Sequence, residues 1–169
     1  MMQLKDILSN VETVKIIGNP AVSMHQIHFD SRKVKKEDVF VAQKGVHTDG
    51  HLYINKAVAS GASVVVCEEL PESLHDNITY IQVPDSDKAL SYMAANFYGN
   101  PSRKLKLVGI TGTNGKTTLA SLSYALFQKA GYVAGLLSTV HIKVANQTYK
   151  ATHTTPDALT INRYLAEMV

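Results

Sequence analysis

A lysine and two threonines close a glycine-rich turn, Gly112-Thr113-Asn114-Gly115-Lys116-Thr117-Thr118. Small residues let the backbone amides from Gly112 to Lys116 point into one concavity and come close to phosphate oxygens. The Lys116 ammonium would then lie on the β- and γ-phosphates of a nucleotide, and the Thr117 hydroxyl would be a ligand of Mg²⁺. The residues therefore predict a phosphate-binding loop. The alternative is an ordinary turn with a solvated lysine.

The residues on either side of this turn predict the elements that hold it. Alternating and then continuous apolar residues over 105–110 are typical of a buried strand. After the turn, apolar residues recur at helical spacing, at Leu119, Leu122, Leu126 and Ala130. Gly131 stands where a helix C-terminal glycine belongs. A strand, a glycine turn and a helix in this order suit an anion at the helix N-terminus, although the common pattern has glycine where this chain has Ile110.

With this departure from the common spacing, the turn at residues 112–118 resembles the ATP loop of the Mur ligases and of their folylpolyglutamate synthetase relatives. Members of the family join an amino acid to a carboxylate and use ATP to form an acyl phosphate. The resemblance implies that all seven residues of the turn bind ATP, that Lys116 is catalytic and that Thr117 holds Mg²⁺.

The overall composition is that of a globular protein. The chain has 169 residues, of which 45% are hydrophobic and 18% are charged, and its net charge is +3. This charge is too small to indicate a nucleic-acid partner. The single cysteine, Cys67, excludes an internal disulfide framework and favours a reducing compartment. No stretch approaches about 18 apolar residues, so we expect no insertion into a membrane. We expect a cytoplasmic protein that is a monomer.

Taken in order, the chain alternates short strands and helices, which predicts an α/β fold in two parts. Strands are expected near 14–17, 26–29, 38–42, 64–67 and 78–83, and helices over 3–9, 51–59 and from 84 to about 98. The stretch 98–103 combines glycine and proline and is the best linker candidate. We therefore place an N-terminal domain at 1–100 and the start of a second domain at 101–169.

The second part is expected to hold little beyond the phosphate loop and its helix. It continues with a strand over 132–138, a hairpin with arms near 140–145 and 147–152, and a helix from Pro156 with Thr155 as its N-cap. So few elements make too small a sheet for a complete nucleotide-binding domain. We therefore expect a truncated P-loop α/β domain.

Three stretches of the N-terminal part, 30–34, 38–42 and 49–51, form a second pattern. They resemble the domain by which the MurE and MurF branches of the Mur ligase family hold the UDP end of a UDP-N-acetylmuramoyl-peptide. From the residues alone, a hydroxyl at a strand end and loop amides can hold a diphosphate, but a structural turn is the stronger alternative. The resemblance implies substrate contacts at Phe29, Ser31, Val46, His47 and Thr48.

The stretch Thr152-His153-Thr154-Thr155-Pro156-Asp157 resembles a substrate motif of the MurE branch that MurF lacks in this form. That branch usually has asparagine where His153 stands. The resemblance implies substrate contacts at His153, Thr154 and Thr155. A good helix start at Thr155-Pro156-Asp157 is the structural alternative, and both interpretations can hold.

The combined resemblance implies an ATP- and Mg²⁺-dependent ligase of peptidoglycan precursor synthesis. It would add the third amino acid to UDP-N-acetylmuramoyl-L-alanyl-D-glutamate, although the identity of that amino acid stays open. The family's remaining catalytic residues are expected beyond position 169, so the chain alone should be inactive. Three alternatives remain: a MurF-type ligase, a non-catalytic UDP-sugar-binding module, and a P-loop kinase or GTPase. The last is disfavoured because an Asn-Lys-x-Asp guanine-recognition motif and clustered arginines are missing from the sequence.

Overall fold

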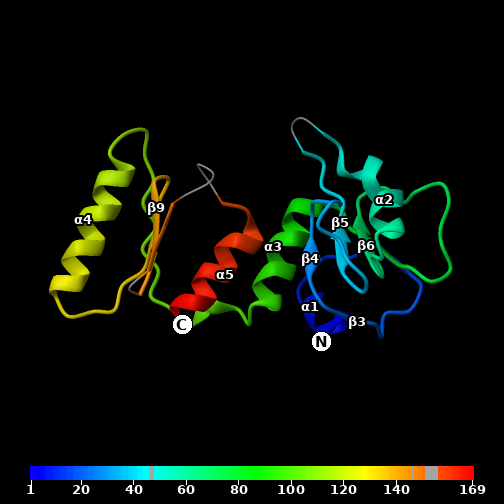
Figure 1. Ribbon diagram of the computed structural model, residues 1–169, viewed down its shortest axis with the longest axis horizontal. Helices are drawn as coiled ribbons and strands as arrows, with labels where there is room; N and C mark the ends of the chain where they lie inside the picture. The colour runs from blue at the N-terminus through cyan, green and yellow to red at the C-terminus, as the bar shows by residue number, and fades with distance from the viewer. Residues whose placement is uncertain (46–47, 146, 151–155) are drawn as a thin grey trace. The chain divides into compact units, whose positions relative to one another are not determined.

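The computed structural model describes residues 1–45, 48–145, 147–150 and 156–169. The chain divides into two compact units, Met1–Phe97 and Tyr98–Val169, and each is described by itself (Figure 1). Both are mixtures of helices and strands, so the predicted α/β class is confirmed. In the part of the chain that the structure describes, no helix is both long and apolar enough to cross a bilayer.

A five-stranded sheet forms the centre of the first unit, in the order β2-β7-β6-β5-β4. Its strands from β4 to β7 are parallel to their neighbours, whereas β2 pairs with β7 in the antiparallel direction and closes one edge. The bounds are β2 Lys15–Ile17, β4 Ile27–His28, β5 Val39–Val41, β6 Val64–Cys67 and β7 Thr79–Gln82. These strands lie within the five ranges expected from the sequence.

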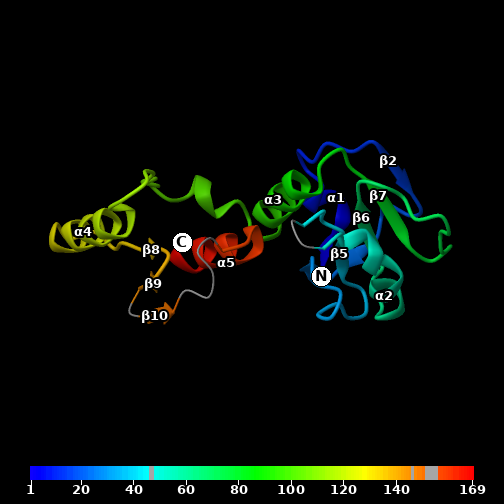
Figure 2. The same ribbon diagram turned by 90° about the horizontal axis from the view of Figure 1, so that it is seen from above.

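The helices of the first unit pack around this sheet (Figure 2). The helical elements are α1 Leu4–Ile7, the 3₁₀-helix η1 Gly50–Tyr53, α2 Ile54–Ala59 and α3 Ser86–Phe97. The single helix expected over 51–59 is thus a 3₁₀ turn that continues into a short α-helix. A small ladder of β1 Met2–Gln3 with β3 Ser23–Met24 was not predicted.

The core of the first unit lies on the middle strands. All four residues of β6 are buried, in keeping with the continuous apolar run of this strand. Phe40 of β5 and Tyr80 of β7 pack with Ile54 and Ala57 of α2 in one hydrophobic cluster. Cys67 belongs to this cluster, and its burial raises the pKa of the thiol to about 11. Cys67 is therefore a buried structural thiol.

The second unit contains a three-stranded antiparallel sheet in the order β10-β9-β8. Its core joins Ile142 and Val144 of the sheet to Tyr164 of the last helix. Strands β9 and β10 match the predicted hairpin. The bounds are η2 Pro101–Arg103, α4 Lys116–Lys129, β8 Leu136–Leu137, β9 His141–Val144, β10 Gln147–Lys150 and α5 Ala158–Met168.

The strand predicted over 105–110 is wrong, because this stretch has no regular structure here. The exposed fractions of Leu107 and Val108 are 58% and 65%, so the stretch is not buried either. A strand forms only where a neighbour pairs with its backbone groups, and the described strands of this unit pair only with one another. The strand expected over 132–138 is likewise reduced to Leu136–Leu137.

The N-cap of the last helix was also predicted wrongly. Helix α5 begins at Ala158, and its N-cap is Asp157 rather than Thr155. The Asp157 carboxylate accepts hydrogen bonds from both the backbone amide and the hydroxyl of Thr160, at 2.9 and 2.7 Å. A carboxylate can satisfy both donors at once, which explains why aspartate caps this helix.

Candidate functional site

The glycine loop of the second unit leads directly into α4, as predicted. Gly115 is the N-cap with φ +77°, and Gly112 has φ +145°, backbone values that favour glycine. The helix ends at Lys129, with Ala130 as its C-cap and Gly131 following at φ +86°. No side chain that the structure describes caps the start of α4. An anion at the first-turn amides would therefore not have to displace such a cap.

Lys116 and Thr117 lie at the start of α4. Lys116 contacts the glycine loop, and Thr117 contacts the segment between β8 and β9. The Lys116 ammonium folds back onto the loop and donates hydrogen bonds to the carbonyl oxygens of Gly112 and Thr113. The hydroxyl of Thr117 lies 3.1 Å from that of Thr139. Thr139 was not predicted, since only the folded chain brings these two hydroxyls together.

These loop residues fit a nucleotide phosphate and a hard cation. Among the residues that the structure describes, the hydrogen-bond partners of the Lys116 ammonium are two neutral carbonyls, so a phosphate oxygen is a stronger competing partner for it. A threonine hydroxyl is the kind of oxygen ligand that Mg²⁺ accepts beside phosphates. The described residues contain no cluster of three or more His, Cys, Asp or Glu that could hold a metal. The Thr117 hydroxyl stays a candidate metal ligand, as the sequence predicts.

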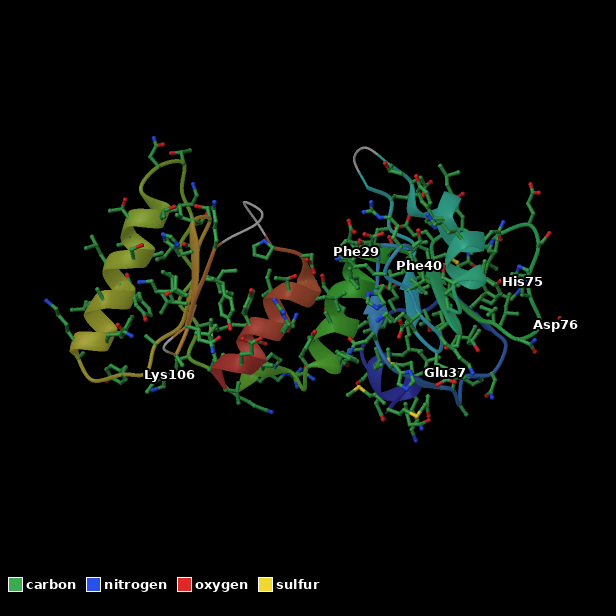
Figure 3. The ribbon with its side chains drawn as sticks, in the orientation of Figure 1. Phe29, Glu37, Phe40, His75, Asp76 and Lys106 are labelled. Carbon is green, nitrogen blue, oxygen red and sulfur yellow. The ribbon has the colours of Figure 1, made fainter. Side chains whose placement is uncertain are left out.

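In the first unit, Ser31 lies in the turn that follows β4. Its exposed fraction is only 6%, and its hydroxyl makes no hydrogen bond with a residue that the structure describes. Phe29, between β4 and this turn, is 39% exposed and is labelled in Figure 3. The turn itself is held by Asp30, whose carboxylate accepts two hydrogen bonds from the Arg32 guanidinium, both at 2.9 Å. The Arg32 partner holds the pKa of Asp30 at about 2.

Asp38 joins the two ends of this turn, a role that sequence reasoning missed. Its carboxylate is buried and accepts the backbone amides of Gln26, before the turn, and Lys35, after it, at 3.1 and 2.8 Å. The imidazole Nε2 of His28 lies 3.2 Å from the same carboxylate. The spacing of Asp38 from the turn gave no signal of these contacts, because they depend on the parallel pairing of β4 with β5.

The loop that follows β5 supplies the other candidate contacts of this unit. Thr48 is exposed, and its carbonyl accepts the amide of Gly45 at 3.1 Å. Val46 and His47 lie outside the described residues, as do His153, Thr154 and Thr155. Because β4 and β5 are parallel neighbours, the turn with Ser31 and the loop with Thr48 follow their carboxyl ends at the same edge of the sheet. Such an edge is where open α/β sheets bind ligands.

Comparison with protein families gives two matches. A model described as "Mur ligase family, catalytic domain" matches residues 23–98. A second model, described as "Mur ligase middle domain", matches residues 110–169. The two matches therefore fall on the two halves of the chain, one on each candidate site.

Curated relatives match nearly the whole chain. A UDP-N-acetylmuramoyl-L-alanyl-D-glutamate–2,6-diaminopimelate ligase from Cytophaga hutchinsonii is 52% identical over 169 residues, which are 99% of this chain and 35% of that protein. The ligase of the same name from Bacteroides fragilis is 49% identical over 167 residues, covering 99% of this chain and 34% of that one. The chain thus spans about a third of the length of the curated relatives it matches.

Solved structures agree with the fold. A structure of a UDP-N-acetylmuramoyl-L-alanyl-D-glutamate–2,6-diaminopimelate ligase matches with a TM-score of 0.72 at 22% identity, covering 99% of this chain and 33% of that one. A MurF structure from Acinetobacter baumannii matches with a TM-score of 0.64 at 21% identity, over 99% of this chain and 33% of the other. At these identities the likeness supports the fold alone.

Proposed function

Because this chain belongs to the Mur ligase family, we propose that it is part of an ATP-dependent ligase of peptidoglycan precursor synthesis. The ligase would add the third amino acid to UDP-N-acetylmuramoyl-L-alanyl-D-glutamate. We take that amino acid to be 2,6-diaminopimelate, since the relatives at 49% and 52% identity carry that name. The observation that carries the proposal is a glycine loop at an uncapped helix start, in a chain with such relatives over 99% of its length.

The second unit is proposed to bind ATP through residues 112–118. The amides at the start of α4 and the Lys116 ammonium would hold phosphate oxygens, and Thr117 would be a ligand of Mg²⁺. Bound Mg²⁺ and ATP supply the activated phosphoryl group and part of the charge neutralisation around it. The contribution of Lys116 is to exchange two neutral carbonyl partners for the charge that develops during phosphoryl transfer.

The first unit is proposed to hold the UDP end of the substrate with Phe29, Ser31, Val46, His47 and Thr48. The hydroxyl of Ser31, which is buried and has no partner among the described residues, is suited to a phosphate or uracil oxygen. The half-exposed ring of Phe29 can cover an aromatic base. The paired threonines Thr154 and Thr155, with His153, would contact the rest of the substrate.

Because the chain spans about a third of its relatives, ligation is proposed for the longer protein. The 169-residue chain is expected to bind its ligands without joining them. A cytoplasmic monomer remains the proposed working state. A MurF-type ligase stays the second candidate, because MurF structures share the fold with TM-scores of 0.62 to 0.64.

Calorimetric titration of this chain tests the proposal. UDP-N-acetylmuramoyl-L-alanyl-D-glutamate should bind saturably, and Ser31→Ala should weaken that binding. The tripeptide that MurF uses should bind no more tightly than the dipeptide. Failure of UDP itself to bind would remove the assignment of the first unit.

ATP binding tests the second unit and the idea of a non-catalytic module. Lys116→Ala should weaken ATP binding, whereas Lys129→Ala at the other end of α4 should leave it unchanged. Equal ATP affinity of the two variants would favour a vestigial loop.

A further inference from the structure

The loop that carries Thr48 is closed at its base by backbone contacts. Lys44 and Asp49 face each other as an isolated antiparallel bridge. Outside this bridge, the amide of Gly50 donates to the carbonyl of Gln43 at 2.7 Å. Inside it, the amide of Gly45 donates to the carbonyl of Thr48. The position of Thr48 therefore depends on what holds Lys44 and Asp49, the two residues at the base of the loop.

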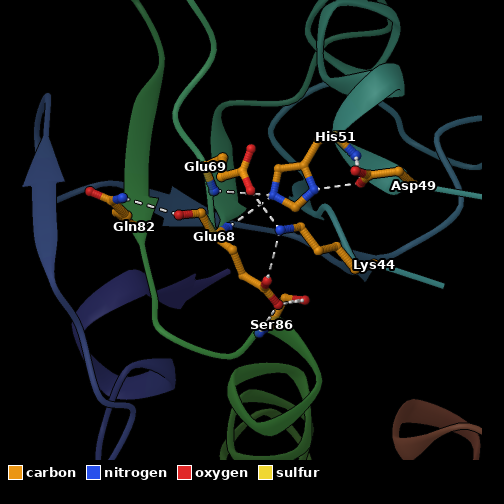
Figure 4. Close-up of polar contacts among 7 residues, drawn as sticks. All are labelled: Lys44, Asp49, His51, Glu68, Glu69, Gln82 and Ser86. Carbon is orange, nitrogen blue, oxygen red and sulfur yellow. Dashed lines mark hydrogen bonds and ion pairs between the residues drawn. The ribbon is translucent and has the colours of Figure 1, made fainter.

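His51 connects one side of this base to the end of β6 (Figure 4). The Asp49 carboxylate accepts the backbone amide of His51 at 2.9 Å and lies 2.6 Å from its Nδ1. The other ring nitrogen, Nε2, lies 2.9 Å from the backbone amide of Glu68 and 3.3 Å from that of Glu69. The backbone hydrogen bond from His51 is the largest cause of the lowered pKa of Asp49.

These contacts fix the proton of the imidazole. Backbone amides only donate, so Nε2 of His51 must be the acceptor from Glu68 and Glu69. The ring proton is then on Nδ1, where it is donated to the Asp49 carboxylate. The side chain of His51 is only 12% exposed, which limits competition from water. Neutral His51 with its proton on Nδ1 is therefore the form that joins the loop to the sheet.

Lys44 connects the other side of the base to the same two residues after β6, Glu68 and Glu69. Its ammonium lies 2.6 Å from a carboxylate oxygen of Glu69 and 3.6 Å from one of Glu68. Glu68 is in turn fixed at the start of α3, because its carboxylate accepts both the amide and the hydroxyl of Ser86, at 2.9 and 2.8 Å. The backbone hydrogen bond from Ser86 is the largest cause of the lowered pKa of Glu68. The backbone carbonyl of Glu68 accepts a hydrogen bond from the side-chain amide of Gln82 at 3.0 Å.

We propose that His51 and Asp49 are positioning residues for the UDP end of the substrate, because they fix the loop of Thr48 to the carboxyl end of β6. The proposal rests on the proposed function, which puts a substrate contact on Thr48. Neither residue needs to touch the substrate. Their contribution is to hold the contact in place before the ligand arrives, which lowers the ordering cost of binding.

Binding of UDP to the chain is the measurement that tests this proposal. His51→Ala removes both ring contacts and should weaken UDP affinity by about tenfold, the equivalent of one or two hydrogen bonds. His51→Gln should recover most of the loss, since its side-chain oxygen can accept the amide of Glu68. The matched control is His75→Ala, an exposed histidine on the opposite side of the first unit from Phe29 (Figure 3).

Rescue by the conservative variant separates positioning from a merely structural role. His51→Gln keeps an acceptor for the amides of Glu68 and Glu69, so its UDP affinity should be close to that of the wild type. If His51→Gln binds UDP as weakly as His51→Ala, the proposal is contradicted.

The outcomes distinguish the proposed UDP site from the positioning role of His51 and Asp49. If Ser31→Ala loses UDP affinity while His51→Ala keeps it, the substrate site stands and the positioning role is overturned. A lower melting temperature of His51→Ala with unchanged UDP affinity overturns it too. If the wild-type chain does not bind UDP, the proposed function of the first unit fails together with the inference. Should His51→Ala not fold, Asp49→Asn takes its place and must show the same weakened binding.

Discussion

At the scale of single residues, the turn that presents Ser31 depends on charge pairing. The Asp30 carboxylate binds the Arg32 guanidinium, and this hydrogen bond is the largest cause of its pKa of about 2. The folded-state pKa is thus below the unfolded value of about 3.9. The pair therefore contributes stability that is fully present above about pH 4 and is lost as the pH falls through about 2.

Replacement of Asp30 by asparagine tests this pairing. The variant should have a lower free energy of unfolding than wild type at pH 7, and the difference should shrink steadily as the pH falls from about 4 to about 2, where about half of the wild-type carboxyl is protonated. Urea unfolding of both proteins across this pH range measures the difference. A difference that stays constant down to pH 2 would assign the effect to shape rather than to charge.

At the scale of elements, α4 is a helix that its apolar spacing predicted, but the apolar face is exposed. Leu119, Leu122 and Leu126 recur at helical spacing, yet their exposed fractions lie between 53% and 67%, and no residue of α4 is buried. The helix follows from the local pattern, as does the buried strand β6 from its continuous apolar run. Whether another element covers the apolar face of a helix depends on the whole fold, so the spacing of apolar residues could not predict it.

The same distinction explains the other errors. The strand expected over 105–110 lacked a pairing partner, which no spacing within the stretch could reveal. Thr155 and Asp157 are both good N-caps in sequence, and only the position of Thr160 decides between them. His51 was noticed as part of a motif, but its partners Glu68 and Glu69 are 17 and 18 residues away. The sequence thus named candidate contacts, whereas the residues that hold the loops in place are found only in the folded chain.

Polar substitution on α4 should be tolerated for this reason. Leu122→Gln and Leu126→Gln keep helix propensity nearly constant and replace side chains that are 63% and 67% exposed. The free energy of unfolding of the second unit should change by no more than about 0.5 kcal/mol. The matched control is Leu165→Gln in α5, which is only 8% exposed and should cost about 2 kcal/mol or more. Urea unfolding followed by circular dichroism measures all three. A large loss at Leu122 or Leu126 would mean that this face is covered in solution, for example by a second copy.

At the scale of the whole molecule, the two units differ in how well their elements are supported. In the first, β6 is a central strand with both neighbours paired and every side chain buried. In the second, α4 is 14 residues long and has no buried side chain. An isolated helix of that length is marginal in water.

Hydrogen exchange should resolve this difference. Amides of Val64–Cys67 should exchange only when the first unit unfolds as a whole, because their hydrogen bonds lie in its core. Amides of Lys116–Lys129 should exchange much faster, by local fraying, and those over 105–110 at nearly intrinsic rates. Mass spectrometry of peptides from these three segments measures the rates. Binding of ATP should then slow exchange at the start of α4 more than at its end, because the proposed phosphate contacts are the first-turn amides. Uniform slowing along α4 would instead indicate that the whole helix becomes packed, and protection like that of β6 without ATP would show that its apolar face is already covered.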